Sequence, residues 1–209
     1  MIEILDKVPK IVMVLMSITI VNLIFFHKKL NEKTTVFFIA IVINFVVELL
    51  GYNTPLNESN VNYYVYGLLL IVFLLYFIFF YLMIKKVILK RIILFCIILF
   101  LVIFFAFLVK NKFTFIDFPS ELYYLDFLTL FICISIFMYE TLNSEKIFYL
   151  KNYFPFWIAL SLLIFYIVMI PALTVKAIEP NIYLSILLFL NIFGYTLLNL
   201  GIIWSKKND

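Results

Sequence analysis

Two acidic residues lie inside long apolar stretches of this sequence. Glu48 falls in the stretch TTVFFIAIVINFVVELLGYNTP, and Asp126 falls in the apolar stretch that follows Glu121. A carboxylate at membrane depth is costly, and it usually marks an ion path, a proton relay or a ligand site. These two carboxylates are therefore the first candidates for chemistry.

Polar and small neighbours support a role for Glu48. Asn44 lies four residues before it and Gly51 three residues after it, so the three share one face of a helix. Lipid offers no hydrogen-bonding partner to an amide or a carboxylate. This face is predicted to turn toward other helices, where Glu48 meets a Tyr, an Asn or a backbone group.

The depth of the two acids allows two interpretations. Glu48 lies about 22 Å along its helix from Lys33, and Asp126 about 7 Å along its helix from Glu121, which places both in the outer half of a bilayer. They could share a pocket open to the outside, or reach water separately. Asp126 is near enough to water for the separate interpretation to be favoured, whereas for Glu48 both stay open. Five tyrosines near this level could form the rim of the pocket or an interfacial belt: Tyr63, Tyr64, Tyr66, Tyr123 and Tyr124.

A polar stripe also occurs in the last apolar stretch, residues 182–204. Asn191, Tyr195 and Asn199 are spaced four apart on one helical face, with Gly194 and Gly201 nearby. Amide side chains and glycines are common at helix contacts in membranes, so packing is favoured over ligand binding. Asn191 and Tyr195 stay candidates for the ligand site.

Catalytic and metal-binding patterns are not found in the sequence. His27 is the single histidine, and Cys96 and Cys133 lie inside apolar runs. There is no phosphate loop, zinc motif or nucleophile elbow. A retinal protein would need a lysine within residues 182–204, which contain none. The chain is predicted to have no enzymatic activity, metal or cofactor.

Composition fixes the class of protein. Hydrophobic residues make up 67% of the 209 residues and charged residues 13%, with a mean hydropathy of +1.18. Soluble domains do not have this composition, so an all-α integral membrane protein is predicted, forming a single transmembrane domain over residues 1–209. The net charge of +4 is assigned to anchors at the membrane surface and not to a nucleic-acid partner.

Seven apolar stretches are long enough to cross the bilayer as helices. The first is followed by His27-Lys28-Lys29 and not by a cleavage site of small residues, so we expect a retained helix rather than a signal peptide. The predicted spans are residues 9–26, 34–51, 62–84, 91–109, 122–140, 153–173 and 182–204.

Lysine and arginine placement predicts the orientation. Eleven of these residues lie in the loops after spans one, three and five and in the tail, against five on the other side. Cytoplasmic loops carry the excess of positive charge. The N-terminus is therefore predicted to lie outside and the C-terminus in the cytoplasm of a bacterial inner membrane.

A faint internal repeat relates the two halves of the chain. A shift of 119 residues brings Asn62-x-Tyr64 onto Asn181-x-Tyr183 and Tyr76 onto Tyr195. Spans two and three would then correspond to spans six and seven, in a three-plus-one-plus-three plan around span four. Parallel repeats of this kind occur in transporters.

Short motifs resemble a loosely defined group of seven-helix membrane proteins of Bacteroidetes that occur beside, or fused to, sensor histidine kinases. The matching positions are His27-Lys28-Lys29, Glu48, Phe156-Trp157-Ile158, Asn191 and Gly201-Ile202-Ile203-Trp204. Val168 and Met169, before Pro171, stand where the group commonly has glycine. The resemblance implies signalling with a histidine kinase or another regulator as partner.

The leading functional prediction is a membrane sensor or regulatory component that binds a small or lipidic ligand in its outer half. The candidate ligand residues are Glu48, Asn44, Asp126, Tyr64, Asn191 and Tyr195. A small solute transporter built on the repeat is the alternative, although the chain has no Gln for a Pro-Gln helix break of the sugar-transporter type. A membrane-embedded hydrolase is disfavoured by the missing acid–base and metal groups.

Overall fold

The computed structural model describes residues 8–26, 32–53, 58–113, 115, 118–176 and 180–205, and every regular element among them is helical. The α-helices are α2 (Val8–Phe26), α3 (Thr34–Asn53), α4 (Glu58–Tyr63), α5 (Phe73–Met83), α6 (Val87–Lys110), α7 (Ser120–Leu142), α8 (Phe154–Lys176) and α9 (Pro180–Trp204). A π-helix, η2 (Tyr64–Val72), joins α4 to α5, and a 3-10 helix, η3 (Glu145–Asn152), precedes α8. The prediction of an all-α protein is confirmed for this part of the chain.

Among the described residues, six helices are long and apolar enough to cross a membrane: Pro9–Phe26, Thr34–Tyr52, Val61–Met83, Val87–Lys110, Ser120–Leu142 and Ser185–Trp204. The bent pair of η3 and α8 raises this number to seven if it is taken as one span. These are the features of a helical membrane protein. The six correspond to predicted spans, while the seventh span and the orientation stay predictions.

Contacts divide the helices into two compact units. Unit 1 comprises residues 1–31 and 144–209, with α2, η3, α8 and α9, and unit 2 comprises residues 32–143, with α3 to α7. This grouping differs from the three-plus-one-plus-three plan, which would place α2, α3 and the α4–η2–α5 span together. The repeat and the single transmembrane domain stay predictions.

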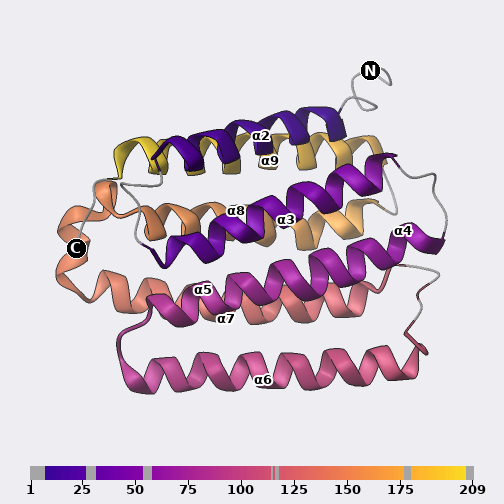
Figure 1. Ribbon diagram of the computed structural model, residues 1–209, viewed down its shortest axis with the longest axis horizontal. Coiled ribbons are helices and arrows are strands. Elements are labelled where there is room, and N and C mark those ends of the chain that lie inside the picture. Colours follow the sequence, from indigo (N-terminus) through magenta and orange to yellow (C-terminus); the bar gives the residue numbers. More distant parts are fainter. Residues whose placement is uncertain are drawn as a thin grey trace. The chain divides into compact units, whose positions relative to one another are not determined.

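The core of unit 2 is aromatic. The α4–η2–α5 span packs against α3, α6 and α7 (Figure 1). Phe77 of α5 meets Phe100 of α6 edge-on with ring centroids 5.1 Å apart, and Phe80 meets Phe137 of α7 at 5.4 Å. Edge-to-face rings add attraction beyond the area they bury. These contacts make the α4–η2–α5 span the helix on which the rest of unit 2 is assembled.

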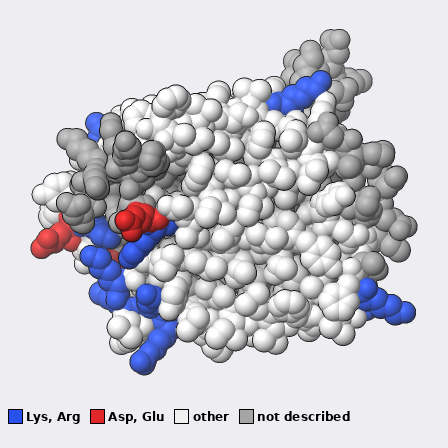
Figure 2. Space-filling view, viewed as in Figure 1, with Lys and Arg blue, Asp and Glu red and all other residues white. Residues whose placement is uncertain are grey.

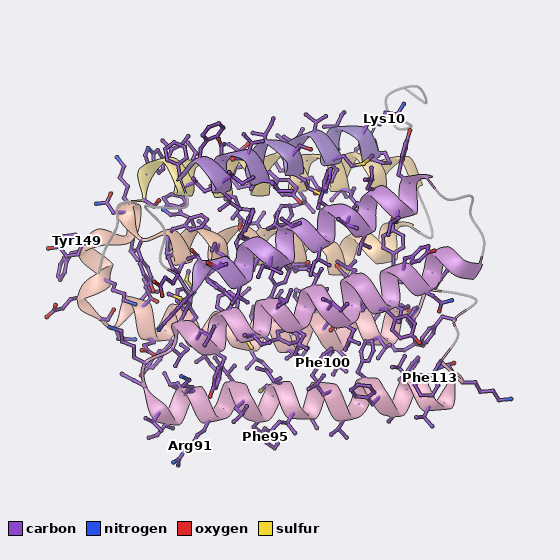
Figure 3. All side chains as sticks on the ribbon, in the orientation of Figure 1. Lys10, Arg91, Phe95, Phe100, Phe113 and Tyr149 are labelled. Carbon is purple, nitrogen blue, oxygen red and sulfur yellow. The ribbon has the colours of Figure 1, made fainter. Side chains whose placement is uncertain are left out.

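Helix α6 presents an uncovered apolar face. Phe100 is fully buried while Phe95 is 65% exposed, and Figure 3 shows the two pointing to opposite sides of the helix. On the face of the molecule drawn in Figure 2, the charged side chains of the described residues lie toward the ends. An apolar surface of this kind suits lipid.

Amides and a glycine join the helices of unit 1. Asn22 of α2 donates to Asn199 Oδ1 of α9 at 2.7 Å, and Asn199 donates to Thr19 Oγ1 at 3.0 Å. Gly201 of α9 faces Trp157 of α8 so closely that a Cβ would clash with the indole side chain. The packing role predicted for the polar stripe is confirmed at Asn199 and Gly201.

Several sequence predictions fall outside the described residues. Residues 27–29, which carry the basic motif after the first span, and residues 206–207 of the basic tail are among them. The side chains of residues 168–171 in α8, on which part of the resemblance depends, are also outside them.

Candidate functional site

One face of α3 forms its contact with the α4–η2–α5 span. Phe37, Ala40, Ile41 and Val47 are buried along it, at the spacing of one helical stripe. Near the first turns of α3, the Phe37 ring lies 5.9 Å from that of Tyr76 and 5.8 Å from that of Phe79. The same stripe carries Asn44, Glu48 and Gly51 toward the last turns of the helix, and Glu48 and Gly51 face Tyr64 of η2.

Glu48 meets Tyr64 where the last turns of α3 face the start of η2. The Tyr64 hydroxyl donates to Glu48 Oε2 at 3.4 Å, and both side chains are half-buried. Gly51 makes the approach possible, because a Cβ at this position would clash with the Tyr64 phenol. The predicted partner of Glu48 is therefore a tyrosine. At 3.4 Å the bond is long for an O–H···O contact and hence weak, so a ligand can replace it at little cost.

Asn44 adds an acceptor that the described residues leave unused. Its Oδ1 is buried and accepts no hydrogen bond from them. It lies one helical turn before Glu48, where side chains four residues apart are neighbours. A buried acceptor left unpaired costs about 1–3 kcal/mol, which a donor on a bound molecule would recover. The site thus offers a carboxylate and an amide oxygen to a ligand that donates hydrogen bonds.

The helix opposite these groups is a π-helix. Residues 64–72 form η2, and the Phe73 amide that follows donates to Leu68 O, five residues back. Most π-helical segments are single-turn bulges, and they are frequent at functional sites. Tyr64 is the first residue of η2, so the phenol that holds Glu48 depends on where the π-helix begins. No local pattern in the sequence YVYGLLLIV predicts this conformation.

Other contacts link the opposite ends of the same helices, near the start of α3 and the end of α5. Lys33 Nζ donates to Leu82 O at 2.9 Å, which links the turn before α3 to the end of α5. Glu140 of α7 accepts the backbone N–H groups of Lys85 at 2.9 Å and Lys86 at 3.5 Å. The sequence carries no signal for this role of Glu140, since only the fold brings it to the turn between α5 and α6.

The structure corrects the interpretation of Asp126 as a carboxylate that reaches water. Asp126 is 0% exposed, and neither of its oxygens has a hydrogen-bond partner among the described residues. One turn nearer the start of α7, the Tyr123 ring packs against Phe73 at 6.3 Å and Phe118 at 6.1 Å. Asp126 is therefore shielded from solvent, although only about 7 Å of helix separates it from Glu121.

Among the described residues no hydrogen bond joins Glu48 directly to Asp126, and the pocket that the two acids could share stays a prediction. Glu48 bonds to Tyr64, whereas Asp126 bonds to no described group. Helices α3 and α7, which carry the two acids, each pack against α5.

The five tyrosines predicted to form a pocket rim or an interfacial belt have different surroundings in the structure. Tyr66 donates to Phe113 O at 2.8 Å, and nearby Asn62 accepts the N–H of Phe115 at 3.2 Å, so both hold the segment between α6 and α7. Tyr123 is buried, whereas Tyr63 and Tyr124 are exposed, as belt residues are. Of the five tyrosines, Tyr64 is the one that bonds to a candidate acid.

Asn191 and Tyr195 lie in unit 1 with contacts typical of packing. Asn191 donates to Leu187 O of its own helix at 2.8 Å, and the buried Tyr195 ring meets Phe165 edge-on at 5.1 Å. Their part in ligand binding stays a prediction. Among the residues that the structure describes, no three or more His, Cys, Asp or Glu gather in a way that could hold a metal ion. No family model, curated protein or solved structure matches this chain.

Proposed function

We propose that this protein is a membrane sensor or regulatory component that binds a small ligand at the outer end of unit 2. The observation that carries the proposal is the weak Tyr64–Glu48 bond beside the unpaired oxygen of Asn44. A carboxylate and an amide oxygen suit a small cation with N–H donors, such as a protonated amine. The protein has no catalytic activity of its own in this proposal.

Ligand binding would be transmitted through the α4–η2–α5 span. A ligand that takes the place of the Tyr64 hydroxyl on Glu48 releases the first residue of η2. A π-helix has an α-helical alternative that differs in register, so η2 is an element with two arrangements. At its inner end the span is bonded to Lys33 and ends at the basic turn capped by Glu140. A partner at the cytoplasmic side, such as the histidine kinase implied by the resemblance, would detect the change there.

A small-molecule panel tests this proposal on the purified protein in detergent. Protonated primary amines are expected to raise the melting temperature, while neutral alcohols of matched shape are not. At a hundred times the dissociation constant, a ligand stabilises its protein by about 2.7 kcal/mol. Glu48→Gln should remove the shift, whereas Glu121→Gln, the same change at an exposed acid in the first turn of α7, should keep it. Equal shifts in both variants would contradict the assignment of the site.

The orientation in a bacterial inner membrane has its own test. Lys112 and Glu145 are exposed residues in predicted loops on opposite sides. Cysteines introduced at these positions are expected to react with an impermeant maleimide from outside at residue 112 and only after lysis at residue 145. Reaction of both from the same side would exclude the seven-span topology, and the reverse pattern would exclude the outside N-terminus. Either result would remove the placement of Glu48 in the outer half.

Transport is the second candidate, and Asp126 favours it. Acids buried in membrane spans mark ion pathways and proton relays, and irregular helices occur at transporter substrate sites. Uptake of a labelled amine into proteoliposomes, driven by a proton gradient, distinguishes the two functions. A sensor binds the amine without accumulating it in the lumen.

A further inference from the structure

The segment between α7 and α8 has the geometry of an element at a membrane surface. The 3-10 helix η3 is bent by 77° from the following part of α8. Because α8 crosses the bilayer in the proposed topology, η3 runs close to the membrane plane, on the cytoplasmic side. Its eight residues form two short helical turns that meet at a kink at Tyr149, where φ is −125° and ψ is 19°.

Apolar side chains of η3 are left uncovered by the protein. Phe148 is 82% exposed, Tyr149 60% and Ile147 43%, and no residue of η3 is buried. Figure 3 shows Tyr149 pointing away from α8. Moving a side chain such as phenylalanine from water into an apolar environment is favourable by a free energy of about 1.5–3 kcal/mol. Aromatic side chains are favoured at the boundary between headgroups and acyl chains, where these residues would lie.

Two lysines accompany these apolar side chains, and aromatic rings hold both in place. Lys146 Nζ donates to the Tyr153 hydroxyl at 2.7 Å and lies 4.3 Å from the centre of its ring. Lys151 Nζ lies 5.1 Å from the centre of the Trp204 ring, while the Lys151 carbonyl accepts the indole N–H of Trp157 at 3.1 Å. Glu145, at the start of η3, is its single acid, so η3 carries a net positive charge.

We propose that η3 is an interfacial anchor that binds an anionic phospholipid headgroup of the cytoplasmic leaflet. Phe148 and its neighbours enter the boundary of the acyl chains, and Lys151 and Lys146 face the lipid phosphate. Charge complementarity and the combination of apolar and basic side chains at one level favour lipid over a protein partner. The proposal depends on the topology and not on the ligand site of unit 2.

The depth of Phe148 in the bilayer is tested with a fluorescent probe. Cysteine replaces Phe148, or Glu145 as the matched control, in a Cys96→Ala, Cys133→Ala protein that keeps the melting temperature of the native chain. Each is labelled with NBD and placed in nanodiscs of zwitterionic phospholipid with or without phosphatidylglycerol. Emission at position 148 is expected to shift to the blue and to be quenched by lipids with a nitroxide near the headgroup. Emission at position 145 should be quenched by aqueous iodide instead. Iodide quenching of both probes would overturn the proposal and leave Phe148 as a surface for a protein partner.

Headgroup selectivity is tested with paired charge variants. Phosphatidylglycerol should bind the native protein more tightly than phosphatidylcholine by native mass spectrometry. The Lys146→Gln, Lys151→Gln protein is expected to lose roughly fivefold in phosphatidylglycerol affinity per lysine. Lys110→Gln with Lys112→Gln makes the same charge change at the other end of the spans and should have a smaller effect on this binding. Equal losses in both double variants, or no loss in either, would overturn the headgroup assignment.

Discussion

Glu48→Gln is expected to abolish the ligand response while the protein keeps its fold. Gln has nearly the shape of Glu and still accepts the Tyr64 hydroxyl, but it removes the negative charge that a cationic ligand requires. Stability should change by less than about 1 kcal/mol, because the partner of Tyr64 remains. The measurements are thermal unfolding in detergent and the amine-dependent shift, together with a growth or reporter phenotype.

Two further variants separate the functional role of Glu48 from a structural one. Glu48→Leu removes the acceptor as well as the charge, so a loss of about 1–3 kcal/mol is expected in addition to the lost response. Tyr64→Phe removes only the hydroxyl, and since its 3.4 Å bond is weak, we expect a small loss of stability. The amine-dependent shift should persist, because Glu48 still binds the amine, whereas the reporter phenotype should be lost, because no Tyr64 bond is left for the ligand to release. A stable and fully active Glu48→Leu protein would remove Glu48 from the site and make α3 an ordinary span.

Asp126→Asn is expected to stabilise the protein, in the opposite direction to the change at Glu48→Leu. The Asp126 carboxyl is completely buried and bonds to no described residue. Replacement by the neutral, nearly isosteric amide removes the cost of burying a charge without removing a bond. A gain on the order of 1–3 kcal/mol is expected at neutral pH. Chemical unfolding in mixed micelles would measure it.

Uptake and ligand binding, measured on the Asp126→Asn protein, distinguish a role of Asp126 in transport from a role in a sensor. If the protein transports its ligand with protons, Asp126→Asn should abolish uptake into proteoliposomes while it raises stability, which is the trade-off expected of a functional residue kept at a cost. If the protein is a sensor, the amine-dependent shift should persist in the stabilised variant. A destabilised Asp126→Asn protein would mean that the carboxylate has a partner, such as an internal water or ion.

Much of this protein could be predicted from its sequence, because a bilayer imposes simple rules. Backbone groups must be satisfied within each segment, so long apolar runs become helices of the length that the hydrocarbon requires. The stripe of Asn44, Glu48 and Gly51 follows from helical periodicity alone, which requires no knowledge of the neighbouring helix. Lipid offers no hydrogen-bonding partner, so a carboxylate on this stripe is expected to find one within the protein.

The identity of the partner and the surroundings of Asp126 required the tertiary structure. Tyr64 and Asp126 are both polar residues near a helix start, and sequence periodicity places both at a similar depth. Yet the fold gives Tyr64 a bond to Glu48 and encloses Asp126 without a described partner. The π-helix of residues 64–72 and the bond from Lys33 to Leu82 likewise have no local signal. Burial and hydrogen bonding across helices depend on which helix faces pack together. In a chain rich in Phe, Ile and Leu, nearly every helix face is apolar enough to pack, so the sequence does not identify the packed faces.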